Sequence, residues 1–432
     1  MSAGTSATIE TKASWAIASV SLVILGIAFG SPWVAVVALK TIAAETGGAR
    51  SVPAFASSLA WFGSGLGGIA MGWLADRYGV RWTALCGTLM IAIGLAIASF
   101  GHTWLGEVNA LYVGHGVFVG LLGIAGLNAP LYVYVSRWFD RRRGSAVALI
   151  SSGQYIAGAL WPPIFERGIA SFGWRETMLM FGLFQLAVNL PLAAIFLKKA
   201  PEVEHHAGAV ALAAGPARIL GWPSNLVFAM LAVAAFCCCV PMSMPQAHLV
   251  ALCTDLGIVA AHGAVMLSIL LGTAFCSRQM WGWISDRIGG LLTVLIGSGW
   301  QFCCIIGFAL TQNEIGLFTV SAIFGLGFSG IIPAYVLTAR ELFPAREAGW
   351  RVPILLCCSG FGMASGGWFA GLLYDQFGYY TPAFTAGLAF NAVNLLLIGT
   401  LVLRRNIWSG SLRVVSAQGP CAAVAQACDG IS

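Results

Sequence analysis

Charged residues are scarce in this sequence. Asp, Glu, Lys and Arg make up 9% of its 432 residues, whereas 59% of the residues are apolar. A soluble globular protein carries about a quarter of its residues as charged ones. The composition therefore excludes a soluble globular protein and predicts a chain that contacts lipid.

Signals for metals, nucleotides and nucleic acids are also missing. The 12 cysteines include no C-x-x-C pair and lie mostly in apolar stretches, which predicts packing roles for them. The net charge is +6, but the basic residues are scattered through short loops and form no long stripe. Two G-x-G-x-x-G matches, at 63–68 and 325–330, lie inside apolar runs and follow no strand. We expect no metal, no cofactor, no nucleotide and no nucleic-acid partner.

The sequence does contain many long apolar runs. A transmembrane helix needs roughly 20 apolar residues, and runs of this kind are bounded here by charges or by Gly and Pro. They cover 14–38, 53–74, 82–101, 106–135, 145–165, 174–197, 224–252, 261–284, 290–311, 315–338, 352–373 and 381–403. We predict an all-α integral membrane protein with 12 transmembrane helices in two pseudo-symmetric six-helix bundles.

Polar stretches divide the chain into four parts. We predict an N-terminal bundle over 14–197 and a C-terminal bundle over 224–403. A cytoplasmic linker over 198–223 joins them, and a cytoplasmic, disordered tail covers 404–432.

Lys and Arg residues are distributed unequally between the two sides of the predicted membrane. Seventeen of the 22 fall on the side of both termini, one (Arg278) lies within a helix, and four lie opposite: Lys40, Arg50, Arg167 and Arg175. Because positive residues favour cytoplasmic loops, we predict a multi-pass protein of the inner (plasma) membrane with both termini in the cytoplasm. We expect it to function in the lipid bilayer as a monomer.

The chain also repeats itself. The stretch GlyTrpLeuAlaAspArgTyrGlyValArg begins at Gly72, and GlyTrpIleSerAspArgIleGlyGly begins at Gly282, 210 residues later. Each stretch follows the second apolar run of its half. The sequence therefore predicts two copies of a six-helix unit, a plan known from transporters that bind substrate between two halves.

The first copy of this stretch resembles the hallmark loop motif of the major facilitator superfamily, and the second is a weaker form of it. The likeness extends over 14–403. Three shorter stretches resemble the branch of monocarboxylate transporters and oxalate/formate antiporters: TrpPhe and basic residues at 138–144, His248 to Gly257, and Tyr374 to Tyr380. The resemblance implies a carrier that works by alternating access.

The resemblance also implies that the loop motif is a conformational latch that touches no substrate. The residues concerned are Gly72, Asp76, Arg77, Gly79, Arg81, Gly282, Asp286 and Arg287. We expect Gly72 and Gly282 to let helices approach closely, and Asp76 to cap a helix N-terminus or to pair with an arginine. The alternative is a solvated loop whose charges only fix topology.

Arg278 is the one charge deep inside a predicted span. It lies eight residues before Asp286, so a helix would bury it about 12 Å from the membrane surface. Its planar fork matches a carboxylate, and its position resembles the substrate-carboxylate arginine of the two families. Their second charge is missing, because Ala274 stands where an acidic partner would be and 352–373 contains no lysine. One cation favours a monoanion; the alternative is an arginine that snorkels or bonds helix carbonyls.

Other polar or aromatic residues in the spans are candidates for weaker roles. For substrate contact these are Trp33, Asn128, Gln154, Tyr155 and Tyr335, and for proton coupling they are His115 and His248. Packing is the alternative for each of them.

We therefore predict a secondary active transporter that moves a small organic anion, a monocarboxylate, with proton coupling as a further hypothesis. The alternatives are a dicarboxylate/formate-type antiporter, an exporter of amphipathic compounds, and a non-transporting membrane sensor. An enzyme is not expected, because the spans contain no paired catalytic carboxylates and no nucleophile constellation.

Overall fold

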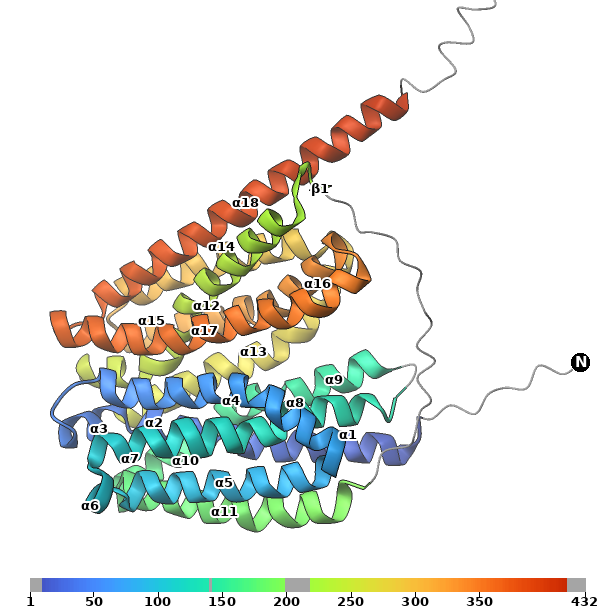
Figure 1. Ribbon diagram of the computed structural model, residues 1–432. Helices are drawn as coiled ribbons and strands as arrows, with labels where there is room; N and C mark the ends of the chain where they lie inside the picture. Colours follow the sequence, from blue (N-terminus) through green and yellow to red (C-terminus); the bar gives the residue numbers. More distant parts are fainter. Residues whose placement is uncertain (1–9, 140–141, 199–217, 418–432) are drawn as a thin grey trace, which may run out of the picture.

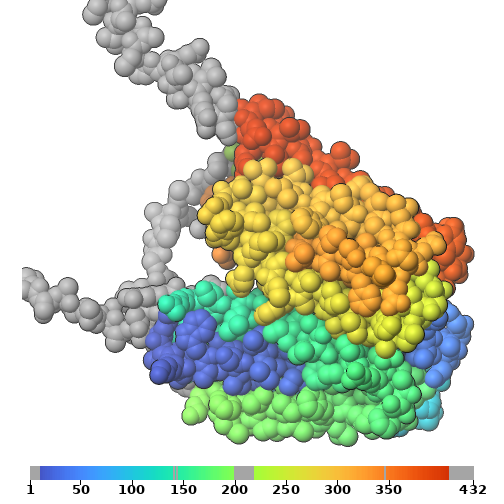
Figure 2. All heavy atoms as spheres, turned by 180° about the vertical axis from the view of Figure 1, so that it is seen from behind, coloured from blue at the N-terminus to red at the C-terminus, as the bar shows by residue number. Residues whose placement is uncertain are grey.

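The computed structural model describes residues 10–139, 142–198 and 218–417, and these residues are almost entirely helical. Figure 1 shows two groups of helices, one up to α11 (blue to green) and one from α12 onward (yellow-green to red). In the view from behind, Figure 2 shows the two groups as adjoining masses that meet along one seam. The predicted linker lies outside the described residues at 199–217, and so does the predicted tail at 418–432.

The first group contains the helices before the linker. They are α1 (Lys12–Ala28), α2 (Ser31–Val37), α3 (Leu39–Glu45), α4 (Ser51–Tyr78), α5 (Val80–Phe100), α6 (His102–Leu105), α7 (Glu107–Tyr112), the π-helix η1 (Val113–Ile124), α8 (Ala125–Ser136), α9 (Arg143–Ser151), α10 (Gly153–Phe172) and α11 (Trp174–Phe196).

The second group follows a short hairpin. Its helices are α12 (Ser224–Asp255), α13 (Ala260–Ile288), α14 (Gly290–Leu310), α15 (Glu314–Phe328), α16 (Ile331–Leu342), α17 (Ala345–Phe377) and α18 (Thr381–Ala417). The hairpin pairs β1 (Arg218–Ile219) with β2 (Trp222–Pro223). It turns on Leu220 and Gly221, whose φ angles of 54° and 79° suit a two-residue turn.

The predicted all-α architecture of twelve membrane helices is confirmed. Within the described residues, eleven helices are long and apolar enough to cross a membrane. The twelfth crossing is α9 with α10, which is interrupted at Ser152 and contains Pro162 and Pro163. The break and the two prolines explain why this crossing is not one long continuous helix.

Two of the predicted continuous runs are broken by glycine and proline. The break between α1 and α2 falls at Gly30, just before Pro32, and that between α15 and α16 falls at Gly330, just before Pro333. Both glycines are tightly packed: an added Cβ would lie 2.6 Å from Phe181 at Gly30 and 2.3 Å from Trp281 at Gly330. Proline removes a helical hydrogen bond next to each close contact.

Helix α18 extends into the range 404–432, which the sequence predicts as a tail. Helix α18 continues through Ala417, because no proline interrupts the chain between Pro382 and Pro420.

The two ends of the bundle differ, and we name them by their connections. The terminus end contains the beginning of α1 and the turns at Gly79 and Gly289; the distal end contains the α3–α4 and α12–α13 connections (46–50 and 256–259). Across the seam, α4 packs against α17 and α10 packs against α13.

Candidate functional site

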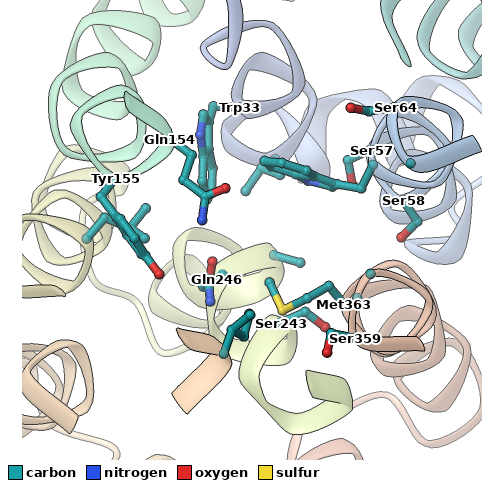
Figure 3. A pocket seen from close by; sticks show the side chains of 18 of the residues that line it. Trp33, Ser57, Ser58, Ser64, Gln154, Tyr155, Ser243, Gln246, Ser359 and Met363 are labelled. Carbon is teal, nitrogen blue, oxygen red and sulfur yellow. The ribbon is translucent and has the colours of Figure 1, made fainter. Parts of the chain in front are cut away.

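A cavity of about 320 Å³ lies between the two groups of helices. Figure 3 shows side chains from both groups converging on it. The labelled ones are Trp33 of α2; Ser57, Ser58 and Ser64 of α4; Gln154 and Tyr155 of α10; Ser243 and Gln246 of α12; and Ser359 and Met363 of α17. None of the described lining residues is charged. The wall is therefore a mixture of hydroxyl, amide and aromatic groups.

Two lining residues present polar atoms that have no partner. The indole Nε1 of Trp33 and the amide Oδ1 of Asn128 are buried, and neither makes a hydrogen bond among the described residues. Three of the six lining hydroxyls behave differently and donate to a backbone carbonyl of their own helix, as Ser57 does to Ala54 O at 2.8 Å and Ser243 to Val240 O at 3.0 Å. Because buried polar groups are rarely left unpaired, Trp33 and Asn128 offer one donor and one acceptor to a ligand.

Four of the five predicted weaker contacts line the cavity: Trp33, Asn128, Gln154 and Tyr155. The fifth residue, Tyr335, is not among the residues that line the cavity. Tyr335 is 1% exposed, and its hydroxyl donates to Asn394 Oδ1 at 2.5 Å inside the second group. A buried tyrosine needs a partner for its hydroxyl, and this one finds it in the protein.

Arg278 lies beside the cavity, toward the terminus end. It is half-buried on α13, its Nη2 donates to Ser151 Oγ at 3.2 Å, and its Cζ lies 5.2 Å from the centre of the Tyr155 ring. Both contacts cross from one group of helices to the other. No carboxylate pairs with Arg278 among the described residues, so its charge is compensated only by a hydroxyl and an aromatic face.

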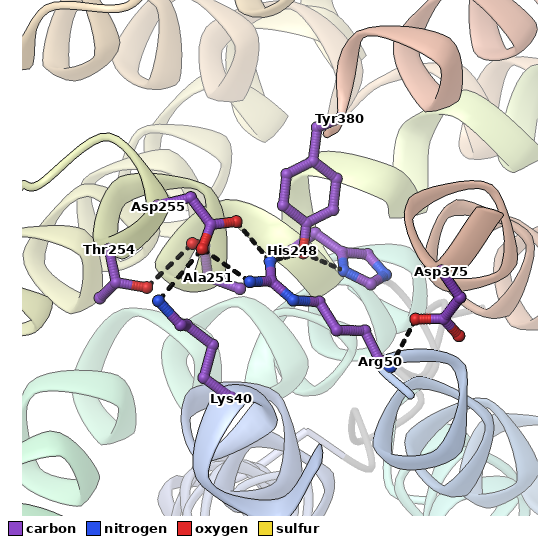
Figure 4. Close-up of polar contacts among 8 residues, drawn as sticks. All are labelled: Lys40, Arg50, His248, Ala251, Thr254, Asp255, Asp375 and Tyr380. Atoms are coloured by element: carbon purple, nitrogen blue, oxygen red, sulfur yellow. Dashed lines mark hydrogen bonds and ion pairs between the residues drawn. The ribbon is translucent and has the colours of Figure 1, made fainter. Parts of the chain in front are cut away.

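The distal end is closed by an ionic contact between the two groups. The guanidinium of Arg50 donates from Nη1 to Asp255 Oδ2 at 2.5 Å and from Nη2 to Oδ1 at 2.6 Å. Lys40 Nζ lies 3.1 Å from the same Oδ1. Figure 4 shows both cations reaching Asp255 from the first group. Bidentate arginine pairs of this kind are among the strongest hydrogen-bonded contacts.

Further groups surround Arg50. Its Nη1 donates to the Tyr380 hydroxyl at 2.8 Å, and its guanidinium lies 3.7 Å from the centre of the Tyr374 ring. Asp375 accepts the backbone N–H of Arg50 at 2.7 Å and that of Ser51 at 2.9 Å, which caps α4. Burial alone would lower the pKa of Arg50, but the bond to Asp255 and the nearby phenol outweigh it, so the pKa is raised. We call Lys40, Arg50, Asp255, Asp375 and Tyr380 the distal lock.

His248 connects the distal lock to the cavity. Its Nδ1 lies 3.0 Å from the Tyr380 hydroxyl and its Nε2 lies 2.7 Å from the carbonyl oxygen of Gly367, which lines the cavity. A carbonyl only accepts, so in the neutral imidazole Nε2 donates to Gly367 and Nδ1 accepts from Tyr380. The other predicted proton-coupling residue, His115, is fully buried, bonds Leu111 O at 3.2 Å and does not line the cavity.

At the terminus end the two groups stand apart. Gly65 on α4, Gly360 on α17 and Leu271 on α13 line the cavity. The glycines about two or three turns farther along the same faces are Gly72, Gly349 and Gly282. An added Cβ would meet nothing within 4 Å at any of these three. The predicted close approach at Gly72 and Gly282 is therefore absent from this structure, because the cavity opens toward this end.

The two copies of the loop motif have different contacts. Asp76 pairs with Arg137 of its own group at 2.8 Å, which is one of its two predicted arrangements. Arg77 lies over Trp73 and Arg287 lies over Trp283. Gly79 has a φ of 92°, which favours glycine. In the part of the chain that the structure describes, Arg81 and Asp286 make no ion pair.

The distal lock is what the sequence reasoning missed. The sequence distinguishes Arg50 and Lys40 only as basic residues on the side of the membrane opposite the termini. Asp255 and Tyr380 fall in two of the stretches that resemble the narrower transporter branch. In the structure both stretches contact Arg50. The available signal in the sequence was that the side opposite the termini has few charges, so that a basic and an acidic residue there could pair.

A cavity between two repeated helical bundles of a membrane protein, closed at one end and open at the other, is the arrangement of a secondary transporter. Residues 18–352 match the family model described as Major Facilitator Superfamily. The chain belongs to this superfamily, whose members are membrane transporters.

Named relatives are distant. The chain is 25% identical to Monocarboxylate transporter 13 of Bos taurus over 348 residues, which cover 79% of this chain and 76% of that protein. It is 23% identical to Agnestins efflux protein AgnL12 of Paecilomyces divaricatus, with 79% and 75% covered. Among solved structures, a D-xylose-proton symporter shares the fold with a TM-score of 0.66 at 14% identity, covering 89% of this chain and 96% of that one.

Proposed function

We propose that this protein carries a small monocarboxylate across the membrane by alternating access. The observation that supports this most is Arg278, a half-buried cation beside a cavity whose described lining residues carry no charge. It stands against Tyr155, which lines the cavity, and it has no described carboxylate partner. The likeness to monocarboxylate transporters supports the same substrate class.

The cavity supplies groups for both parts of such a substrate. Trp33 offers an indole N–H, Gln154 offers an amide, and Tyr155 offers a hydroxyl next to the Arg278 charge. The aromatic faces and Met363 suit a short apolar body. Since Arg278 is the only nearby cation among the described residues, a monoanion fits better than the dianion of a dicarboxylate/formate-type antiporter.

The direction of opening follows from the charge distribution. With both termini in the cytoplasm of the inner (plasma) membrane, the open terminus end faces the cytoplasm and the distal lock faces outward. We propose that a single chain suffices, because both cavity walls come from one chain. Of the two candidate histidines, His248 is the better proton-coupling residue, since it bonds both the distal lock and a cavity-lining backbone. Equal uptake at about pH 5.5 and 8 would argue against proton coupling.

The test is uptake of radiolabelled mono- and dicarboxylates into proteoliposomes. We expect Arg278→Gln to reduce uptake of the preferred monocarboxylate about tenfold or more, as expected for the loss of a charge-assisted hydrogen bond. Arg278→Lys keeps the charge and should retain part of the activity. Arg404→Gln is the control, because it removes an exposed arginine that lies over Trp222, outside both the cavity and the loop motif. Wild-type uptake by Arg278→Gln would refute the anion proposal.

An exporter of amphipathic compounds is the second candidate. An apolar pocket between α4 and α17 is lined by Phe55, Phe62, Phe361 and Trp368, and it shares Ser58 with the cavity. The likeness to an efflux protein points the same way. Binding of apolar cations by purified protein, with no response to carboxylates, would favour this candidate. Transport of either substrate class would argue against a non-transporting sensor.

A further inference from the structure

The distal lock contains a carboxylate in a cage made mainly by the opposite half of the molecule. Asp255 belongs to the second group of helices, whereas Arg50 and Lys40, which hold its two oxygens, belong to the first. The Arg50 side chain is 8% exposed. It is also held by the Tyr380 hydroxyl (Figure 4) and by the Tyr374 ring, so the fork that faces Asp255 is fixed in place.

If the two halves separated at the distal end, the positive groups of the distal lock would stay on one half and its carboxylates on the other. The first group contains Lys40, Arg50 and the N-terminus of α4, all positive, and the second contains Asp255 and Asp375. The acidic residues near the cations on the first group do not compensate them, because Glu45 and Glu107 both pair with Arg175. An open distal end would therefore leave two cations facing the outer side without a described acidic partner.

Two members of the cage, Asp255 and Lys40, are partly exposed even in this closed state. A pocket of about 370 Å³ at the distal end is lined by Asp255 and Tyr380, together with Gln312 and Tyr379. The Asp255 side chain is 22% exposed, and that of Lys40 is 43% exposed. Neither Arg50 nor Lys40 lines this pocket, so a small solute meets the cage at the exposed parts of Asp255 and Lys40.

We propose that Arg50 and Lys40 form a second carboxylate site, which Asp255 occupies in this state and the carboxylate of the transported anion occupies when the distal end opens. Asp255 acts as the internal competitor of the substrate, so an arriving anion replaces it and compensates the cations that separation would expose. The bonds from Arg50 through Tyr380 and His248 to Gly367 connect this site to the cavity. This inference rests on the proposed function and adds an outer site to the one at Arg278.

The experiment measures stabilisation of the purified full chain by acetate, with acetamide as the uncharged control. All variants carry Arg278→Gln, which removes the cation beside the cavity. Ligand that binds the folded state raises the melting temperature as its concentration exceeds its Kd. Adding Asp255→Asn removes the competing carboxylate. We expect acetate to stabilise this double variant at roughly one tenth, or less, of the concentration that the Arg278→Gln variant needs, because an intramolecular competitor is lost.

Three comparisons decide the result. Adding Arg50→Gln to the Asp255→Asn variant should abolish the acetate effect, and Lys40→Gln should weaken it several-fold, by loss of one charged contact. Glu314→Gln removes a distal carboxylate that is paired with His262. Added to Arg278→Gln, it should leave the acetate response of the Arg278→Gln variant unchanged. If Asp255→Asn does not fold, Asp255→Ser takes its place.

The inference is overturned if acetate acts equally with and without Arg50, or no more strongly than acetamide. Because every variant lacks the Arg278 cation, this result is independent of the uptake test. Carboxylate uptake that requires Arg278, combined with no acetate effect at the distal lock, would leave the proposed function intact and remove only the outer site.

Discussion

The two ends of this transporter are built on different principles. At the distal end, long charged and aromatic side chains connect the halves, with Arg50 and Asp255 at the centre. At the terminus end, small residues such as Gly72 and Gly349 face open space. A specific ion pair fixes one closed geometry, whereas glycines allow helices to approach without a bond. The difference indicates that each end needs its own kind of contact to close.

Helices α4 and α17 show this difference along their own lengths. At the distal end, a Cβ added to Gly371 would lie 2.8 Å from Ser51 Cα. Near the cavity, the rings of Phe62 and Phe361 are 4.7 Å apart. Beyond the cavity, the two helices separate. The aromatic contact therefore lies between the packed distal part and the open part of this helix pair.

Each half, in contrast, is held together internally by equivalent bonds. Gln185 Nε2 donates to Thr88 O at 2.8 Å in the first half, and Asn391 Nδ2 donates to Ser298 O at 3.0 Å in the second. Thr88 and Ser298 are 210 residues apart, which is the offset of the loop motif. Buried amide bonds at matching positions support two rigid halves with motion between them.

The largest effect is expected from reversing one charge of the distal lock. Arg50→Asp places a carboxylate against Asp255 and removes a buried pair, and loss of one partner of such a pair costs about 3–5 kcal/mol. We expect uptake into proteoliposomes to fall at least roughly 100-fold, as about 3 kcal/mol implies, with a lower melting temperature.

The double variant Arg50→Asp with Asp255→Arg is the control, because it restores an ion pair with the charges exchanged. Its melting temperature should return most of the way to that of the wild type. A single Arg50→Asp variant that transports at the wild-type rate would show that the distal lock is not needed for closure.

A smaller effect is expected from filling the open end. In this state the Gly72→Leu side chain meets no neighbour, so the melting temperature should change by about 2 °C or less. Uptake should nevertheless fall about tenfold, because the helices at the terminus end could no longer approach.

Gly371→Leu is the matched variant at the distal end. The added side chain would collide with the backbone at Ser51 in this state, so the melting temperature itself should fall. If the two variants had the same effect on stability, the contrast between the ends would be lost.

The spans could be predicted from the sequence because length and apolarity decide them. The breaks at Gly30 and Gly330 could not, because each depends on a side chain from another helix, Phe181 or Trp281. The same limit applies to the cavity. Tyr155 and Tyr335 give the same signal in sequence, a tyrosine inside an apolar run, and only tertiary packing turns one toward the cavity and the other into a helix group.

The distal lock is hard to predict from the sequence for a related reason. Arg50 and Asp255 are 205 residues apart, and each reads locally as a loop charge. Arg278 was easier to recognise, because a lone charge in an apolar run is costly wherever the helix lies. Arg278 can thus be recognised from its isolation in the apolar sequence. The role of Arg50 can be recognised only from its contact with Asp255 in the structure.

A still smaller effect is expected from the loop motif at the open end. The pair between Asp76 and Arg137 is exposed, at 65% and 41% of the two side chains, and exposed pairs contribute about 0–1 kcal/mol. Asp76→Asn should therefore leave the melting temperature and the substrate half-saturation almost unchanged, while reducing the uptake rate several-fold if the motif is a latch. Asp286→Asn, which breaks no described ion pair, should reduce uptake less. Equal uptake by Asp76→Asn and the wild type would remove the latch role.

The smallest effect is expected from Tyr380→Phe, which keeps the ring and removes the hydroxyl between Arg50 and His248. The loss of such hydrogen bonds costs about 1 kcal/mol, or about 2 °C in melting temperature.

This difference between Tyr380→Phe and the wild type should be the same at about pH 7 and 9. Burial raises the pKa of Tyr380 above its ordinary value of 10, and the pKa of Arg50 is raised as well. A contribution from a group with a raised pKa is complete below its unfolded value and is lost only as pH rises through the folded one. Both groups therefore keep their protons across this window, and melting curves of the two proteins should shift in parallel. A difference that disappears at pH 9 would mean that the phenol ionises early and that the distal end loosens in alkali.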